Sequence, residues 1–310
     1  MDRKIFVALS TFAQEGPEPL EILTSSGCRF AINPSGKRLT KEQVITQARG
    51  FDGIVAGLES YDALVLEALP DLKCISRCGV GMDNVDLAKA KEKKIAVLNT
   101  PDVVVQPVAE LTIAMIFDLL RRTTEQTVLM RARKWERRTG NLLSGKTVAV
   151  IGTGRIGRRV GELLRLWDVN VLGVDVHPDE GWARQHGVKI VGLAQALAAA
   201  DIISLHVSTS AEDPFCLGAN EFAQMKNGAF LINVSRGSLI DEDALFQALR
   251  RGHLAGAGLD VYRQEPYAGP LCDLANVVLT PHAATLTRES RLAMEVEAVR
   301  NIIDFFKQAT

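Results

Sequence analysis

Short apolar segments rich in β-branched residues alternate along the chain with longer segments whose apolar residues have helical spacing. Nearly all-apolar runs are typical of strands buried on both faces of a parallel sheet, because helices cover both faces. The first set of runs predicts five strands, at residues 5–9, 29–32, 53–56, 72–76 and 95–98. Five strands are enough for one small α/β sheet.

A second set of apolar runs predicts a larger doubly wound sheet. Its strands are expected at 148–151, 169–174, 202–205, 230–234, 257–260 and 277–279, with a weaker candidate at 189–191. Between the two sets, Pro107 stands where the first turn of a helix tolerates it, and apolar residues follow at helical spacing. Residues 288–307 predict a last helix that could pack on either domain. The fold class is therefore α/β, with two doubly wound parallel sheets.

Length and charge narrow the class of protein. The chain has 310 residues, which suggests two domains at about 150 residues each. Its 36 Lys and Arg against 37 Asp and Glu leave a formal charge of −1, so we expect neither a nucleic-acid nor a membrane partner. The densest basic stretches, Arg121–Arg122 and Arg131–Arg138, are expected to be solvated helix faces. No apolar run approaches the roughly 18 residues that a membrane span needs.

The N-terminus and the cysteines favour a cytoplasmic protein. We interpret residues 5–9 as a first buried strand rather than as the core of a short signal peptide. The five cysteines include no CxxC pair and no paired ligand spacing, so we expect no metal site. We interpret them as buried small apolar residues in a reducing cytoplasm: Cys28, Cys74, Cys78, Cys216 and Cys272.

A glycine motif follows the predicted strand 148–151 directly and precedes a helical pattern. Residues 152–157 read GTGRIG, and this strand–turn–helix context is what a dinucleotide-binding motif requires. Gly152 would make the turn, Gly154 would let the backbone approach a pyrophosphate, and Gly157 would let the helix meet the sheet. The alternative interpretation is a tight structural turn.

The strand after this helix ends at Asp175, 18 residues beyond Gly157. A carboxylate there could accept hydrogen bonds from the adenosine ribose and would repel a 2′-phosphate, which favours NAD over NADP. Arg158 and Arg159 could offset that preference if they faced the ribose, but we expect both to face solvent.

Three residues follow predicted strands where an open parallel sheet binds its ligands. Arg236 could pair with a substrate carboxylate and polarise the adjacent carbonyl. His282 could give a proton to a forming alkoxide, and Glu265 could fix its tautomer. Taken singly, each also has an ordinary interpretation as a surface salt bridge, a loop histidine or a turn residue.

With these motifs in this order, the chain resembles the D-isomer-specific 2-hydroxyacid dehydrogenases, and is most similar to their D-3-phosphoglycerate dehydrogenase branch. The resemblance covers nearly the whole chain and rests on residues 79–86, 108–111, 145–157, 233–237, 258–261, 264–266 and 280–282. It implies that Arg236, Glu265 and His282 are the catalytic residues and that NAD is the cofactor.

The resemblance also implies which residues contact the ligands. Cofactor contacts are expected from Val80, Gly152, Gly154, Arg155, Ile156, Gly157, Asp175, Val207, Val234, Ser235 and Asp260, with Asp260 near the nicotinamide amide. Substrate contacts are expected from Arg236, His282 and a loop that offers backbone amides to a carboxylate: Arg77, Cys78, Gly79, Val80 and Gly81.

The domain organisation implied by the resemblance is a split one. Residues 101–284 would form a Rossmann NAD-binding domain, and residues 1–100 with 285–310 a smaller, flavodoxin-like substrate domain. Members of the family are commonly dimers joined through the cofactor domain, so we expect a homodimer.

The resemblance implies NAD-dependent interconversion of a 2-hydroxy acid and its 2-oxo acid, with 3-phosphoglycerate as the leading substrate. Ala56-Gly57 stands where animal phosphoglycerate dehydrogenases carry Arg-Ser, although the match at Arg77 remains. A glyoxylate or hydroxypyruvate reductase is therefore an alternative, as is an NADH-sensing protein of the corepressor type. Formate dehydrogenases have Gln at the position of Glu265, so the acid favours a 2-oxo acid reductase. No regulatory domain follows residue 310 in this chain, so serine feedback through one is not expected.

Overall fold

The computed structural model describes residues 3–208 and 215–308. Contacts within the chain divide it into two compact units. The outer unit consists of Met1–Val104 and Thr285–Thr310, and the central unit is Val105–Ala284. The first boundary thus follows Val104, whereas the sequence analysis placed it after residue 100.

The outer unit is built on five parallel strands in the order β2-β1-β3-β4-β5. This is the strand order of flavodoxin-like doubly wound sheets. Together with the sheet of the central unit, it confirms the predicted α/β class. The strands are β1 (Lys4–Val7), β2 (Arg29–Ile32), β3 (Gly53–Ala56), β4 (Cys74–Arg77) and β5 (Ala96–Leu98).

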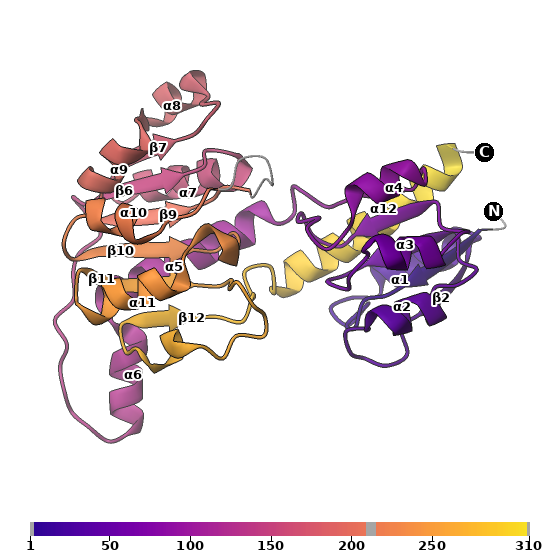
Figure 1. The fold of residues 1–310 in the computed structure, drawn as a ribbon, viewed down its shortest axis with the longest axis horizontal. Helices are drawn as coiled ribbons and strands as arrows, with labels where there is room; N and C mark the ends of the chain where they lie inside the picture. Colours follow the sequence, from indigo (N-terminus) through magenta and orange to yellow (C-terminus); the bar gives the residue numbers. More distant parts are fainter. Residues whose placement is uncertain (1–2, 209–214, 309–310) are drawn as a thin grey trace. The chain divides into compact units, whose positions relative to one another are not determined.

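Helices cover both faces of this sheet, which explains why its strands are almost entirely apolar (Figure 1). The C-terminal helix α12 packs beside α1 on one face, and α2, α3 and α4 cover the other. The last helix predicted at 288–307 therefore belongs to the outer unit. The helices are α1 (Glu18–Ser25), α2 (Lys41–Gln47), α3 (Ala63–Ala68), α4 (Leu87–Glu92) and α12 (Arg288–Gln308).

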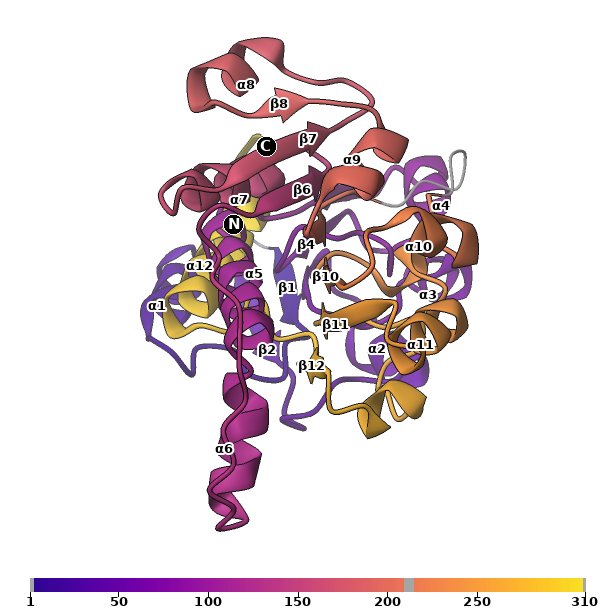
Figure 2. The same cartoon turned by 90° about the vertical axis from the view of Figure 1, so that its left-hand side faces the viewer.

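The central unit contains a sheet of seven parallel strands in the order β12-β11-β10-β9-β6-β7-β8 (Figure 2). The chain starts in the middle at β6, proceeds outward to β8, and then returns to β9 on the other side of β6. Ligands of open α/β sheets bind at the carboxyl edge beside such a reversal. The strands are β6 (Thr147–Ile151), β7 (Asn170–Val174), β8 (Lys189–Ile190), β9 (Ile202–Leu205), β10 (Ala229–Asn233), β11 (Leu254–Leu259) and β12 (Val277–Leu279).

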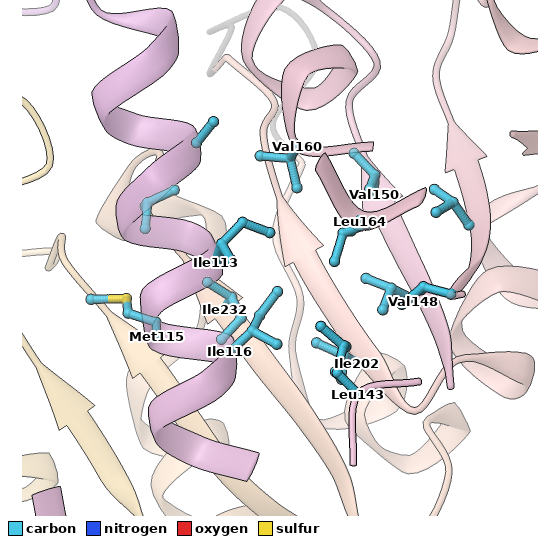
Figure 3. Packing of buried hydrophobic residues seen from close by; sticks show 14 of the residues in the cluster. Ile113, Met115, Ile116, Leu143, Val148, Val150, Val160, Leu164, Ile202 and Ile232 are labelled. Atoms are coloured by element: carbon cyan, nitrogen blue, oxygen red, sulfur yellow. The ribbon is translucent and has the colours of Figure 1, made fainter. Parts of the chain in front are cut away.

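The core of the central unit lies between this sheet and its helices. On one face, Ile113 and Ile116 of α5 (Val105–Arg121) pack with Ile232 of β10, while Val160 and Leu164 of α7 lie near β6 (Figure 3). The other face is covered by a second apolar cluster that includes residues of α9, α10 and α11. The helices not yet named are α7 (Arg155–Arg165), α8 (Glu180–His186), α9 (Leu193–Ala199), α10 (Ala219–Gln224) and α11 (Glu242–Arg250).

Helix α6 (Thr123–Arg131) differs from the others because none of its residues is buried. It extends away from the sheet of the central unit (Figures 1 and 2). The basic stretch 131–138 was predicted to be a helix face, but only Arg131 is helical. The rest is non-helical chain, which is exposed except at the partly buried Arg138, and Arg133 has a positive φ of 58°. None of the helices in the described part of the chain is long and apolar enough to cross a membrane.

The prediction that all five cysteines are buried is wrong for two of them. Cys28, Cys74 and Cys78 are buried, whereas Cys216 and Cys272 are exposed. Each exposed cysteine is next to a fully buried leucine, Leu217 or Leu271. Because neighbouring side chains in such short surface segments point in different directions, the leucine occupies the inward position and the cysteine faces outward.

Candidate active site

The glycine motif forms a tight connection from β6 to α7. Gly152 has a φ of +93°, and a Cβ there would lie 2.5 Å from the carbonyl oxygen of His206. A Cβ at Gly157 would lie 1.9 Å from the carbonyl oxygen of Gly152, so both positions require glycine. At Gly154, by contrast, a Cβ would meet only open space. The surface above the start of α7 is thus open where backbone N–H groups and the helix dipole favour a pyrophosphate, and the loop fits a dinucleotide.

Asp175 follows β7 and reaches across to the glycine loop. Its Oδ2 accepts hydrogen bonds from the backbone N–H (2.6 Å) and the hydroxyl (3.0 Å) of Thr153, and its Oδ1 accepts one from the N–H of His177 (2.9 Å). Partial burial alone would raise the pKa of Asp175, but the hydrogen bonds from His177 and Thr153 outweigh burial and lower it. Asp175 is therefore a carboxylate at neutral pH, beside the glycine loop.

Arg158 and Arg159 are each more than one-third exposed (37% and 38%), as expected, but both also hydrogen-bond to neighbouring residues. Arg158 donates from Nε to the carbonyl oxygen of Thr153 at 2.9 Å, and Arg159 donates from Nε to Oε1 of Gln106 at 2.7 Å. A long arginine in the first turns of a helix can fold back onto the loop before it, where carbonyl and carboxylate groups attract the guanidinium.

Arg236 stands in a turn at the carboxyl end of β10. The buried Asn233 holds this turn, because its Nδ2 donates to the carbonyl oxygen of Arg236 (2.8 Å) and its Oδ1 accepts from the N–H of Ser235 (3.1 Å). The Ser235 hydroxyl donates to the carbonyl oxygen of Leu205 on β9 at 2.7 Å. The turn is thus anchored to two neighbouring strands, β9 and β10.

Glu265 and His282 form a direct contact. Nδ1 of His282 lies 2.9 Å from Oε2 of Glu265, and both side chains are about one-third exposed (38% and 35%). The structure thus brings together two residues on opposite sides of β12 in the sequence, one in the connection before this strand and one in the loop after it. With Nδ1 held by a carboxylate, Nε2 is the nitrogen left to exchange a proton with a substrate.

The loop that carries His282 is fixed by Asp260, whose side chain is completely buried. The Asp260 carboxylate accepts hydrogen bonds from the Thr280 hydroxyl and from the N–H groups of Ala283 (2.7 Å) and Ala284 (3.0 Å). In addition, the N–H of His282 donates to the Asp260 carbonyl oxygen at 2.8 Å. Asp260 therefore determines where the imidazole stands.

Tyr262 contacts Glu265 and residues close in sequence to Arg236 and His282, and the sequence analysis did not single it out. Its N–H donates to Oε1 of Glu265 (3.2 Å), and its hydroxyl lies within hydrogen-bonding distance of the carbonyl oxygens of Leu259 (3.1 Å) and Thr280 (3.0 Å). A Cβ at Gly237, the residue after Arg236, would lie 1.9 Å from the Tyr262 carbonyl carbon. The available signal was an aromatic residue three positions after the end of β11 and three positions before Glu265.

His206 is a second residue that the sequence analysis passed over. It follows β9, next to the predicted cofactor contact Val207, and its Nε2 lies 2.8 Å from the Ser204 hydroxyl. Its buried Nδ1 has no hydrogen-bond partner among the described residues, and burial lowers the pKa of His206 to about 3. His206 is therefore neutral at physiological pH, and its place at the end of an apolar strand was the signal.

The predicted substrate loop, residues 77–81, belongs to the outer unit. Gly79 has a φ of +132°, and a Cβ there would lie 1.8 Å from Nη1 of Arg77. The N–H groups of Cys78 and Gly79 already donate to the Ala56 carbonyl oxygen and the Thr100 hydroxyl, both at 2.8 Å. The N–H groups of Val80 and Gly81 make no hydrogen bond with another described residue, so these two are the better candidates to hold a carboxylate.

Comparison with known proteins agrees with this geometry. Residues 113–284 match the family model described as D-isomer specific 2-hydroxyacid dehydrogenase, NAD binding domain. The chain belongs to this family. The central unit therefore contains the NAD-binding domain of a 2-hydroxyacid dehydrogenase, and NAD is its cofactor.

Relatives within the family differ in their substrates. The chain is 36% identical over 295 residues to a D-3-phosphoglycerate dehydrogenase from Archaeoglobus fulgidus, covering 94% of this chain but 55% of that protein. It is 35% identical over 275 residues to a glyoxylate reductase from Korarchaeum cryptofilum, covering 86% and 83%. The chain thus spans about half the length of the phosphoglycerate dehydrogenase. Among solved structures, an acyclic imino acid reductase in complex with NADPH and D-arginine is 27% identical, with a TM-score of 0.88 over 98% of this chain and 97% of the other.

Replacing Asp260 by Asn should loosen the loop that carries His282. An amide in this pocket turns an NH₂ group toward at least one of the N–H donors of Ala283 and Ala284, so a buried hydrogen bond is lost. The expected loss of stability is about 1–3 kcal/mol. Thermal unfolding measures it, and hydrogen exchange of the Ala283 and Ala284 amides should accelerate. The matched control Asp273→Asn, at an exposed position, should change neither quantity. Unchanged exchange at both amides would contradict the role of Asp260.

Proposed function

We propose that this protein is an NAD-dependent dehydrogenase that interconverts a D-2-hydroxy acid and its 2-oxo acid. The observation that carries the proposal is the contact of 2.9 Å between Nδ1 of His282 and Oε2 of Glu265, in a unit that matches an NAD-binding domain. A carboxylate–imidazole pair is the usual means of protein acid–base catalysis near neutral pH.

Each of the three residues has a distinct role in this proposal. Arg236 pairs with the substrate carboxylate and polarises the adjacent carbonyl. His282 gives a proton from Nε2 to the forming alkoxide and takes it back in the reverse direction, while Glu265 holds the ring and stabilises its charged form. The nicotinamide, when bound, supplies the hydride chemistry.

Apart from Val80, the residues proposed to hold NAD lie at the carboxyl edge of the seven-stranded sheet, on loops and in the first turn of α7. The glycine loop and the first turn of α7 would hold the pyrophosphate, and Asp175 the adenosine ribose. Asp260 and the loop that it holds would lie near the amide of the nicotinamide ring of NAD. The full proposed set is Val80, Gly152, Gly154, Arg155, Ile156, Gly157, Asp175, Val207, Val234, Ser235 and Asp260.

The leading substrate pair in this proposal is 3-phosphoglycerate and 3-phosphooxypyruvate, supported by the relatives that carry that name and by Arg77 in the substrate loop. A second candidate, reduction of glyoxylate or hydroxypyruvate, is favoured by the end of β3. There Ala56-Gly57 supplies no cation, and the buried Glu59 carboxylate accepts from the Gly57 N–H at 2.8 Å. Burial raises the pKa of Glu59, against the hydrogen bonds from its own backbone and from Gly57.

The substrate is tested by following NADH consumption at 340 nm with 3-phosphooxypyruvate, hydroxypyruvate, glyoxylate and pyruvate. We expect the highest kcat/KM with 3-phosphooxypyruvate. A preference for hydroxypyruvate or glyoxylate would keep the mechanism and replace the substrate. Tight NADH binding without turnover of any of the four acids would instead support the NADH-sensing alternative.

Removing the proposed catalytic groups should abolish most of the turnover without preventing NADH binding. His282→Ala and Arg236→Ala are each expected to lower kcat/KM by at least about 100-fold, the usual loss for an acid–base or carboxylate-binding group. His253→Gln and Arg250→Ala serve as matched controls outside the site and should stay within about threefold of the parent. Near-normal turnover in either site variant would overturn the assignment.

We also propose that the protein is a homodimer joined through the central unit. Helix α6 has only nine residues and buries none of them, although isolated helices shorter than about 12–15 residues are marginal in water. Large apolar side chains are exposed on it and on the segment that follows: Val128 (61%), Met130 (52%), Trp135 (79%) and Leu142 (74%). A second copy of the chain would cover this surface by two-fold symmetry.

Charged or polar substitutions on this surface should break the dimer. We expect the parent protein to sediment as a dimer at micromolar concentration and Val128→Asp with Trp135→Ser to sediment as a monomer, because a buried interface does not tolerate an unpaired carboxylate. Leu64→Asp, at an equally exposed position of the outer unit, is the control and should remain dimeric. A monomeric parent, or a dimeric double variant, contradicts the proposed interface.

A cytoplasmic location is part of the same proposal. Cys28, Cys74, Cys78, Cys216 and Cys272 are all free thiols. Unpaired cysteines are typical of reducing compartments, where disulfides rarely persist.

A further inference from the structure

Arg158 occupies a defined site beside the carboxylate that is expected to bind the adenosine ribose. Its Nε donates to the carbonyl oxygen of Thr153 at 2.9 Å, while the N–H and hydroxyl of the same Thr153 donate to Asp175. Arg158 and Asp175 are therefore two contacts apart, joined through one residue of the glycine loop. A cation joined to Asp175 through a single residue bears on whether a ribose 2′-phosphate is tolerated.

A second carboxylate holds Arg158 from the other side. Nη1 of Arg158 lies 3.0 Å from Oδ2 of Asp179, the residue that caps the start of α8. The guanidinium carbon also lies 5.4 Å from the centre of the Trp182 ring, within the range of a cation–π contact. Three different groups therefore fix the Arg158 side chain: a carbonyl, a carboxylate and an indole.

Asp179 and Trp182 are themselves held in place. The N–H of Trp182 donates to Oδ1 of Asp179 at 3.0 Å, and the Trp182 indole N–H donates to Oε1 of Glu162 at 3.1 Å. Asp179 thus uses one oxygen to cap the helix and the other to bind Arg158. In this arrangement, the positive charge of Arg158 is neutralised by Asp179 and is not available to a ligand.

The charges of the cluster decide what it can bind. Asp175 and Asp179 together outweigh the single positive charge of Arg158. A ribose with free hydroxyls can donate to Asp175, whereas a 2′-phosphate would bring a charge of roughly −1.5 to −2 into the same place. As long as Asp179 neutralises Arg158, nothing in this cluster offsets that repulsion.

We propose that Asp179 and Trp182 keep the Arg158 guanidinium occupied, so that it does not bind a 2′-phosphate. Together with Asp175, they thereby determine the preference for NAD over NADP. Asp175 repels the 2′-phosphate directly. Asp179 neutralises Arg158, the arginine of this cluster that could otherwise pair with the 2′-phosphate. The inference concerns dinucleotide binding by the central unit, so it holds or fails independently of the proposed substrate and of the proposed catalytic residues.

The test is to release Arg158 and measure binding of the two dinucleotides. Asp179→Asn keeps the helix cap, because Asn caps as well as Asp, but removes the charge. We expect the Kd for NADPH to fall by about tenfold, the effect of one gained charge-assisted hydrogen bond, while the Kd for NADH stays within about twofold. Isothermal titration reports both constants without any substrate. The gain should shrink as KCl is raised, since the new contact is exposed and screened by salt.

A double variant and two further substitutions keep the test decisive. Adding Arg158→Gln to Asp179→Asn should remove the gain in NADPH affinity, because the released cation is then absent. Asp179→Ser, which also caps a helix, replaces Asp179→Asn if the latter unfolds. Asp304→Asn, which breaks an exposed ion pair with Lys307 in the outer unit, is the matched control and should leave the ratio of the two Kd values unchanged. An unchanged ratio in both Asp179 variants, or a gain that survives Arg158→Gln, overturns the proposal.

Discussion

The buried carboxylate of Asp260 is the interaction on which the arrangement of the site depends. A charge that is removed from water costs several kcal/mol unless hydrogen bonds replace its hydration. Here the replacement comes from the Thr280 hydroxyl and the N–H groups of Ala283 and Ala284. Because the carboxylate must have these donors, the chain after β12 has to turn back over the end of β11. His282 lies within that turn and has a positive φ of 52°, a conformation that is uncommon for a non-glycine residue.

The same edge of the sheet brings the other proposed groups together by short connections. Asn233 holds the turn of Arg236 after β10, and Tyr262 links the neighbouring segment to Glu265 and to the carbonyl oxygen of Thr280. All these residues come shortly after parallel strands, and parallel strands end at one edge. The site is therefore built from loops whose starting points are fixed by the sheet, while backbone-directed hydrogen bonds fix the loops themselves.

The two ends of the proposed cofactor site use charge in opposite ways. Near His282, the Glu265 carboxylate lies against the imidazole that is proposed to transfer the proton. Near the glycine loop, Asp175 is kept as a carboxylate by backbone donors, and Arg158 is neutralised by Asp179. In both places, a carboxylate from another part of the chain limits what the charged side chain can bind or exchange. Glu265 has this effect on His282, and Asp179 has it on Arg158.

The sequence by itself predicted the strands, the two-sheet α/β class and the glycine loop, because these depend on local periodicity and on short motifs. It also singled out Arg236, Glu265 and His282 as candidates, because each stands in a short motif after a predicted strand. Helical spacing also indicated the C-terminal helix, but only the resemblance to the dehydrogenase family implied that this helix joins the N-terminal unit. Only the tertiary structure showed that the Asp260 carboxylate binds the backbone of the loop that carries His282, and that Tyr262 hydrogen-bonds to Glu265. It also showed that Cys216 and Cys272 are exposed. It likewise showed that the partly exposed Arg158 is paired with Asp179. Each of these depends on which side chains meet across loops that are distant in the chain, and side-chain hydrogen bonds of that kind leave no periodic pattern in the sequence.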